Sequence, residues 1–243
     1  MSQILAVTSG KGGVGKSTVA IGVSLAFCRM GKKVLLIDMD EGLRCLDLIL
    51  GVEEQTVFDL ADILLGSEAE NAIYRVPGIE GLSLIPAPAK AGMIDPFSFT
   101  RFAKEIAEKF DTVIFDFPAG MDFTLYPCLP AGALYLTVAT PDPVSVRDAA
   151  AVSDQLEALA CPARLVINNF RYSLLRHGLS RNIDEMIDTS GLQLLGVIPH
   201  SEELASLSIT HSLPKNCKAA AAFLRLAKRL NGEHVLLPKL KKL

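Results

Sequence analysis

Short apolar runs alternate with longer segments of helical periodicity along most of the chain. The apolar runs are nearly continuous, which is typical of strands that are covered on both faces of a sheet. They lie at Ile4–Thr8, Val34–Asp38, Leu82–Pro86, Thr112–Asp116, Ala133–Ala139, Arg164–Asn168 and Leu194–Ile198. Helical patterns fall between them, at Ser17–Met30, Val57–Leu65, Pro96–Lys109, Val144–Ala160, Ile183–Thr189 and Lys218–Leu230. This alternation predicts an α/β fold with a mostly parallel, twisted sheet and helices on both faces.

No linker or break in composition divides the chain before its C-terminal end. We therefore predict a single domain over residues 1–232 and a short basic and apolar tail over residues 233–243. Half of the residues are apolar and 21% are charged, so we expect a sizeable core and no long disordered segment. No apolar run is long enough for a membrane-spanning helix, and the first residues are unlike a signal peptide. These features favour a cytoplasmic protein.

The net charge, the cysteines and the histidines argue against several other classes of protein. The formal net charge of −3 argues against a nucleic-acid surface that covers a whole face. The five cysteines are widely spaced and form no Cys-x-x-Cys pair, as expected of reduced thiols in a cytosolic protein. The four histidines show no metal-ligand spacing.

The segment Gly10–Ser17 carries the clearest chemical signal. It reads Gly-Lys-Gly-Gly-Val-Gly-Lys-Ser and fits the phosphate-binding pattern Gly-x4-Gly-Lys-Ser/Thr. A predicted strand precedes it and a predicted helix follows it, so backbone N–H groups and a helix N-terminus can point at a phosphate. Lys16 can then reach the terminal phosphates, and the Ser17 hydroxyl can bind Mg²⁺. The other predicted nucleotide contacts are Gly12, Gly13, Val14, Gly15 and Thr18.

The same glycines satisfy a second pattern. Gly10-x-Gly12-x-x-Gly15 is the dinucleotide-binding fingerprint, and Asp38 ends the next predicted strand, where a ribose-binding acid would lie. Lys16 has no role in dinucleotide binding and a defined role in triphosphate binding. We therefore favour a phosphate-loop nucleoside triphosphatase and keep a dinucleotide-binding oxidoreductase as a remote alternative.

Acidic residues follow two predicted strands. Asp38 and Asp40 close the second strand, and Asp116 ends the fourth. In a nucleoside triphosphatase one such carboxylate orients the attacking water, and others hold Mg²⁺ directly or through water. We place Asp40 in the catalytic set and both Asp40 and Asp116 at the metal. Solvated carboxylates at strand ends are the simpler alternative.

Two further strand ends suit a nucleobase. Asn168 ends the sixth predicted strand, and Pro199 follows the seventh. A side-chain amide offers both a donor and an acceptor to an adenine edge. An asparagine after a strand is also a common turn residue, and that alternative stays open.

Together these motifs resemble the MinD/ParA group of P-loop ATPases, which belongs to the SIMIBI type. The two-lysine loop from Lys11 to Ser17 is similar to the deviant Walker A motif of that group. The segment 38–48, with its Gly-Leu-Arg-Cys-Leu-Asp stretch, and the Asp-Phe-Pro-Ala-Gly segment from Asp116 resemble the MinD branch, which determines septum sites. The similarity extends to about residue 215, although Cys45 and Phe117 replace residues more usual in that branch.

The resemblance implies an ATPase that dimerises face to face around two nucleotides. In that arrangement Lys11 would reach across to the partner's phosphates, while Lys16 and Ser17 would act on the phosphates and Mg²⁺ of their own protomer. Asp40 would help to position the water, Asn168 would contact adenine, and the segment at Pro199 would close over the base. An activator or effector protein is an expected partner.

Other roles within the group remain open, namely a ParA-type DNA partition ATPase and a flagellar-number regulator. A relative of the iron–sulfur carriers is disfavoured because no second cysteine accompanies Cys128 in a suitable place. A catalytically inactive nucleotide-binding scaffold is disfavoured because both loop lysines and both acids, Asp40 and Asp116, are present.

The C-terminal tail departs from the family pattern. MinD proteins end in a basic amphipathic helix that binds membrane in the ATP-bound dimer. Here Pro238 permits a helix only from that residue onward. The tail still carries leucines at helical spacing and three lysines: Leu236, Leu237, Leu240, Leu243, Lys239, Lys241 and Lys242. We therefore expect weak binding at the inner face of the cell membrane that needs the dimer, and we expect no binding to nucleic acid.

Overall fold

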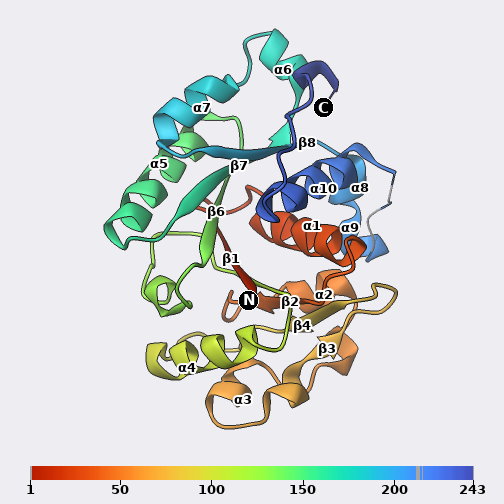
Figure 1. Ribbon diagram of the computed structural model, residues 1–243, viewed down its shortest axis with the longest axis vertical. Coiled ribbons are helices and arrows are strands. Elements are labelled where there is room, and N and C mark those ends of the chain that lie inside the picture. The colour runs from red at the N-terminus through yellow and green to blue at the C-terminus, as the bar shows by residue number, and fades with distance from the viewer. Residues whose placement is uncertain (1, 212–213, 215, 243) are drawn as a thin grey trace.

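One sheet of eight strands forms the centre of the molecule (Figure 1). The computed structural model describes residues 2–211, 214 and 216–242. The strand order is β3-β4-β2-β5-β1-β6-β7-β8, and all neighbours are parallel except β3, which runs antiparallel to β4. The strands are β1 (Gln3–Thr8), β2 (Val34–Asp38), β3 (Tyr74–Arg75), β4 (Leu82–Ile85), β5 (Thr112–Asp116), β6 (Leu134–Ala139), β7 (Ala163–Phe170) and β8 (Leu194–Pro199). The predicted fold class is thereby confirmed.

Helices cover both faces of this sheet. Helices α1 (Lys16–Arg29) and α10 (Lys218–Leu230) pack against each other on one face (Figure 1). Helices α4 (Pro96–Ala107), α5 (Pro143–Ala158) and α7 (Ile183–Ser190) lie on the other face, where their apolar residues join two further core clusters. Both faces are therefore buried, which explains the nearly continuous apolar composition of the strands.

The register of three central strands brings the predicted acids together. Strand β5 lies between β1 and β2, with Asp116 opposite Val7 on one side and opposite Asp38 on the other. The loop that follows β1 begins at the same carboxyl edge. Ligands of parallel sheets bind at this edge, so the strand order alone places the acids beside the glycine loop.

Short elements are the main difference from the sequence prediction. The helix expected at Val57–Leu65 is observed as α3 (Leu60–Leu64), because Asp59 forms a capping box that starts the helix later. The other short elements span too few residues to show a period. They are α2 (Leu46–Leu50), α6 (Tyr172–Arg176), α8 (Glu202–Ala205), α9 (Leu207–Thr210) and the 3-10 turns Glu53–Gln55, Ala69–Ala72, Tyr126–Cys128 and Leu240–Lys242.

The C-terminal tail packs back onto the domain. Leu237 and Leu240 are half-buried against the apolar cluster formed by α5, α7, β7 and β8, whereas Leu236 is 75% exposed. Leu243 lies outside the described residues. Arg229 Nε donates to the Val235 carbonyl, which fixes the start of the tail. Leu237 and Leu240 therefore pack inward, and Leu236 faces outward. Among the residues that the structure describes, no helix has the length and apolar character needed to span a bilayer.

Candidate functional site

The glycine loop between β1 and α1 has a geometry that other residues would not tolerate. Gly13 and Gly15 adopt left-handed backbone conformations, with φ of 79° and 85°. A Cβ on Gly15 would lie 2.2 Å from Asn168 Nδ2, and one on Gly10 would lie 2.7 Å from the Asp148 carbonyl oxygen. The loop is therefore closely surrounded on two sides, and its remaining open side faces a pocket.

Lys16, the first residue of α1, forms an ion pair with Asp116 at the end of β5. The Lys16 Nζ atom lies 2.9 Å from Asp116 Oδ1 and 3.4 Å from Ser17 Oγ. Burial raises the pKa of Asp116, while the charge of Lys16 and the hydroxyl of Ser17 oppose that rise. A fully buried carboxylate next to a buried ammonium is costly unless both are satisfied, so this pair is a strong candidate for chemistry.

The two aspartates at the end of β2 have different surroundings. The Asp38 carboxylate is fully buried and accepts hydrogen bonds from the backbone N–H groups of Asp40, Cys45 and Leu46 at 2.9 to 3.1 Å. Burial raises the pKa of Asp38 to about 6, against the lowering effect of these donors. The Asp40 carboxylate lines the pocket beside the glycine loop. Asp38 therefore holds the chain that follows β2, whereas Asp40 faces the pocket.

The pocket beside the loop has a volume of about 390 Å³. Backbone and side chains of the loop form one wall, and the segment after β5 forms another. Its lining residues are Ser9, Lys11, Gly12, Gly13, Gly15, Lys16, Ser17, Thr18, Asp40, Leu43, Pro118 and Ala119. The predicted phosphate and catalytic residues are thus brought together, whereas the Val14 side chain is buried in the core.

Mg²⁺ is the metal that such a pocket would take, and the residues present fit it. Asp116 Oδ2 is buried and has no hydrogen-bond partner among the described residues. A metal-bound water would satisfy this oxygen. No group of three or more histidine, cysteine or acidic side chains in the described chain could hold a metal alone.

Lys11 lies at the rim of the pocket and pairs with Asp142. Its Nζ atom is 3.7 Å from Asp142 Oδ1, and the two side chains are 44% and 41% exposed. Asp142 also caps α5, because the same carboxylate oxygen accepts from the backbone N–H of Ser145. The second loop lysine is therefore held in its own protomer by a solvent-exposed contact, which is weak.

A second pocket of about 250 Å³ adjoins the loop on the side of β7 and β8. It contains both predicted adenine contacts, Asn168 and Pro199, together with Thr140, Asn169 and His200. The buried Asn168 amide donates through Nδ2 to the Val14 carbonyl at 2.8 Å. Asn168 therefore braces the glycine loop, and its carbonyl oxygen is the group left for a base.

Sequence reasoning missed the polar residues at the mouth of this second pocket. His200 Nδ1 lies 2.7 Å from Asn169 Oδ1, and its Nε2 lies 2.8 Å from Arg171 Nη2. Asn169 has a left-handed φ of 57°. The adjacent pair Asn168-Asn169 at a strand end was the only sequence signal for this group, since left-handed residues are often asparagine.

Aromatic rings support the segment that follows Asp116. Phe117 is buried, with its ring centroid 4.5 Å from that of Tyr126. The Tyr126 hydroxyl in turn lies 2.5 Å from Thr8 Oγ1, at the end of β1. The two strands that carry the glycine loop and Asp116 are thus joined behind the pocket, a role that the sequence did not reveal.

This strand–loop–helix site and its sheet define a P-loop nucleotide-binding domain. A family profile described as the CobQ/CobB/MinD/ParA nucleotide binding domain matches residues 5–214. The chain therefore belongs to the CobQ/CobB/MinD/ParA family of nucleotide-binding domains.

Within this family the similarity is to MinD proteins. The septum site-determining protein MinD of Thermotoga maritima is 33% identical over 97% of this chain and 90% of its own length. The MinC:MinD cell division complex of Aquifex aeolicus contains a chain that is 30% identical, with a TM-score of 0.89 over 98% of this chain and 99% of that one. Pyrococcus horikoshii MinD complexed with Mg-ADP is 26% identical, with a TM-score of 0.81 over 95% and 96%.

Proposed function

We propose that this chain is a Mg²⁺-dependent ATPase whose ATP-bound form dimerises and acts as a MinD-like switch in placing the division septum. The observation that carries the proposal is the buried Lys16–Asp116 ion pair, in which Lys16 lines the loop pocket. A phosphate at the loop would give Lys16 a second anionic partner, and the adjacent Ser17 hydroxyl would bind the metal. Similarity to MinD over nearly the full length supports the biological role.

Each protomer contributes defined groups to this mechanism. Backbone N–H groups of residues 12–18, with Lys16, bind and orient the phosphates. Ser17 would hold Mg²⁺ directly and Asp116 through water, with Asp40 close to both. Bound Mg²⁺ neutralises charge that develops on the phosphate oxygens. Asp40 orients the attacking water, and Asn168 Oδ1 with the Pro199 segment receives the base. Lys11 leaves Asp142 and reaches the phosphates of the partner.

Partners and location follow from the same proposal. The Aquifex aeolicus complex joins MinD to MinC, and an effector protein of that kind is the partner we propose for this chain. The protein acts in the cytoplasm and at the inner face of the membrane, where the basic tail over residues 233–243 contributes to binding.

The central test is Lys16→Ala. We expect ATP binding or hydrolysis to weaken by about 30- to 1,000-fold, because a charge-assisted phosphate contact is worth roughly 2–4 kcal/mol in a water-excluded site. Binding is measured with a fluorescent ATP analogue, and hydrolysis by phosphate release. Lys104→Ala on the exposed face of α4 is the control. If Lys16→Ala binds and hydrolyses ATP like the wild type, the assignment of the site is wrong.

A further inference from the structure

Helix α6 and the C-terminal tail form one continuous surface that the nucleotide site does not use. Leu175 of α6 and Leu237 and Leu240 of the tail pack against the same apolar cluster. Figure 1 shows the dark blue C-terminal segment beside α6 at the top of the molecule. We call residues 171–182 and 234–242 the α6–tail surface.

This surface has a charge unlike that of the rest of the chain. Its two segments contain six arginines and lysines and no aspartate or glutamate, whereas the whole chain has a formal net charge of −3. Arg181 pairs with Glu185, and Arg171 contacts His200. In the described part of the chain the other four cations form no ion pair: Arg176, Lys239, Lys241 and Lys242.

Exposed apolar side chains stand among these cations. The exposed fraction is 73% for Leu179 and 75% for Leu236, and Tyr172 and Leu174 are also exposed. The tail alone offers little of this apolar area, since Leu237 and Leu240 are turned toward the core. Most of it therefore comes from α6 and the turn after it.

The leucines of α6 are held in a defined turn. The N–H of Leu179 donates to the Leu174 carbonyl at 2.9 Å, and the N–H of Gly178 donates to the Leu175 carbonyl at 3.0 Å. With the left-handed Gly178, at φ 68°, these two bonds form a Schellman motif. This motif brings the residues at the positions of Leu174 and Leu179 next to each other. The apolar pair is thus fixed by backbone hydrogen bonds and is exposed at low entropic cost.

We propose that the α6–tail surface docks on an anionic lipid bilayer, with Leu174, Leu179 and Leu236 entering the interface and the cations facing lipid phosphates. The cations complement the negative charge of the bilayer surface. The exposed leucines favour lipid over nucleic acid, because a nucleic-acid backbone offers leucines no apolar interior to enter. The proposal rests on the membrane role within the proposed function, but it assigns the contact to a folded surface rather than to the tail alone.

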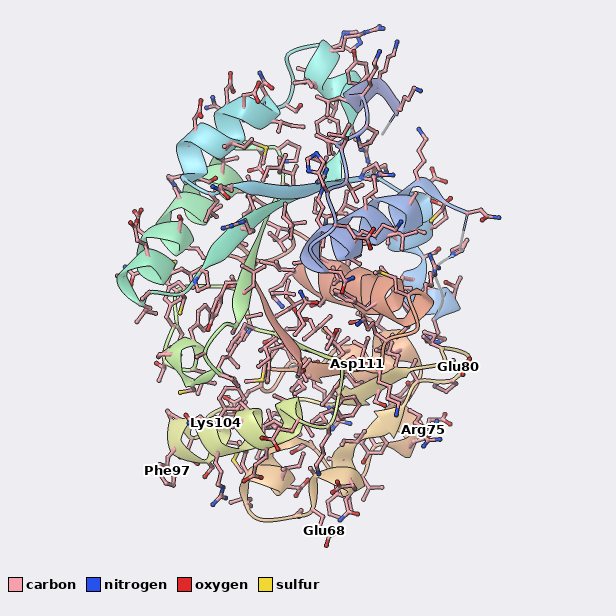
Figure 2. All side chains as sticks on the ribbon, in the orientation of Figure 1. Glu68, Arg75, Glu80, Phe97, Lys104 and Asp111 are labelled. Atoms are coloured by element: carbon pink, nitrogen blue, oxygen red, sulfur yellow. The ribbon has the colours of Figure 1, made fainter. Side chains whose placement is uncertain are left out.

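The test compares matched variants in vesicle co-sedimentation. The probes are vesicles of phosphatidylglycerol in phosphatidylcholine, vesicles of phosphatidylcholine alone, and duplex DNA. Leu179→Ser removes an exposed leucine of the surface. Leu65→Ser is its control, because Leu65 is 77% exposed and directly follows α3, which lies at the opposite end of the molecule from α6 in Figure 1. Arg176→Glu tests the charge, with Lys104→Glu as control; Figure 2 shows Lys104 on α4, also far from α6.

We expect Leu179→Ser to weaken partitioning onto anionic vesicles by about ten-fold or more. Arg176→Glu should weaken it by at least about five-fold, and less in high salt. Both controls should bind like the wild type, and phosphatidylcholine vesicles should bind little protein. Circular dichroism and thermal unfolding verify that each variant is folded.

Several results would overturn the proposal. If the wild type does not bind anionic vesicles in either the ATP or the ADP state, the surface is not a lipid contact. The same conclusion follows if Leu179→Ser binds these vesicles as well as Leu65→Ser does. Binding to DNA that depends on Arg176 but not on Leu179 would assign the surface to nucleic acid instead. Sedimentation without vesicles keeps the two proposals separate. Failure to form an ATP-dependent dimer counts against the proposed function, whereas a normal dimer with unchanged Leu179→Ser binding counts against the surface alone.

Discussion

At the scale of single residues, Asp38 and Asp40 show how neighbours in sequence take different roles. Both carboxylates follow the same strand, and sequence reasoning could not separate them. The structure gives Asp38 three backbone donors in the interior and gives Asp40 a position on the pocket wall. Asp38 is therefore a structural acceptor, and Asp40 is the carboxylate that we propose for hydrolysis.

This difference predicts that one alanine substitution mainly lowers stability and the other mainly slows ATP hydrolysis. Asp38→Ala should lower the free energy of unfolding by about 2–4 kcal/mol, because three backbone N–H groups lose their acceptor, while removal of a buried charge offsets part of that loss. Asp40→Ala should change the free energy of unfolding by less than about 0.5 kcal/mol. It should slow ATP hydrolysis and allow the ATP-bound dimer to accumulate. Urea denaturation and phosphate release measure the two effects, and equal losses of stability would contradict the division of roles.

The contact between Lys11 and Asp142 gives a second prediction at this scale. Asp142→Asn keeps the cap of α5, since asparagine caps a helix as well as aspartate does, but it removes the anion that holds Lys11. We expect the ATP-dependent dimer to become tighter by up to about thirty-fold at low salt, because each of the two Lys11 side chains leaves an exposed ion pair worth at most about 1 kcal/mol. Analytical ultracentrifugation at low and high salt measures this change. A weaker dimer would show that Asp142 serves the interface itself.

The sequence predicted the residues of the loop pocket well, because a contiguous motif places them together. It did not predict the hydrogen bond by which Asn168 braces the glycine loop. The hydrogen bond from Asn168 to the Val14 carbonyl joins residues that are 154 positions apart, and only the packing of β7 beside the loop creates it. The contact between Tyr126 and Thr8 also joins residues that are far apart in the sequence. No sequence pattern around either residue predicts it.

At the scale of elements, the packing of α10 on α1 supports the helix that carries the loop. Gly22 lies at the contact, where a Cβ would come within 2.3 Å of the Phe223 ring. Phe223 is fully buried and has little room to move. The close approach of the two helices therefore depends on this glycine, although the sequence shows it only as an ordinary residue inside a helical pattern.

Gly22→Ala should accordingly destabilise the fold by about 1–3 kcal/mol through overpacking, despite the better helix propensity of alanine. Phe223→Leu should recover part of this loss in the double variant while being destabilising alone. Urea denaturation of the wild type, both single variants and the double variant gives the coupling free energy. Strictly additive effects would mean that the two residues do not compete for the same space.

Elements with a long, regular pattern were predicted with nearly the right bounds, as α10 illustrates. Elements of four or five residues, such as α2 and α6, were not predicted, because one turn of helix shows no repeat. Their positions depend instead on tertiary contacts, such as the Asp38 carboxylate that accepts from the first N–H group of α2. These short elements nevertheless border the two regions that we propose to be functional, the loop pocket and the α6–tail surface.

At the scale of the whole molecule, one protomer holds every group proposed for binding ATP, but its second loop lysine is held away by Asp142. If Lys11 acts on the phosphates of a partner, hydrolysis needs two protomers. The rate per protomer should then rise with protein concentration until the dimer is saturated, since each active site is completed by association. A site complete in one protomer would give a rate that is independent of concentration.

Lys11→Ala provides the decisive comparison for this dependence. Lys16 and the backbone N–H groups remain, so this variant should bind ATP with an affinity within a few-fold of the wild type, roughly 1 kcal/mol or less. It should stay monomeric with ATP, and its slow hydrolysis should no longer depend on concentration. Nucleotide titration, sedimentation velocity and phosphate release at increasing concentrations test these three points. An unchanged ATP-dependent dimer would remove the role of Lys11 across the interface. Loss of nucleotide binding would instead place Lys11 on the phosphates of its own protomer, because only a contact within one chain can act before association.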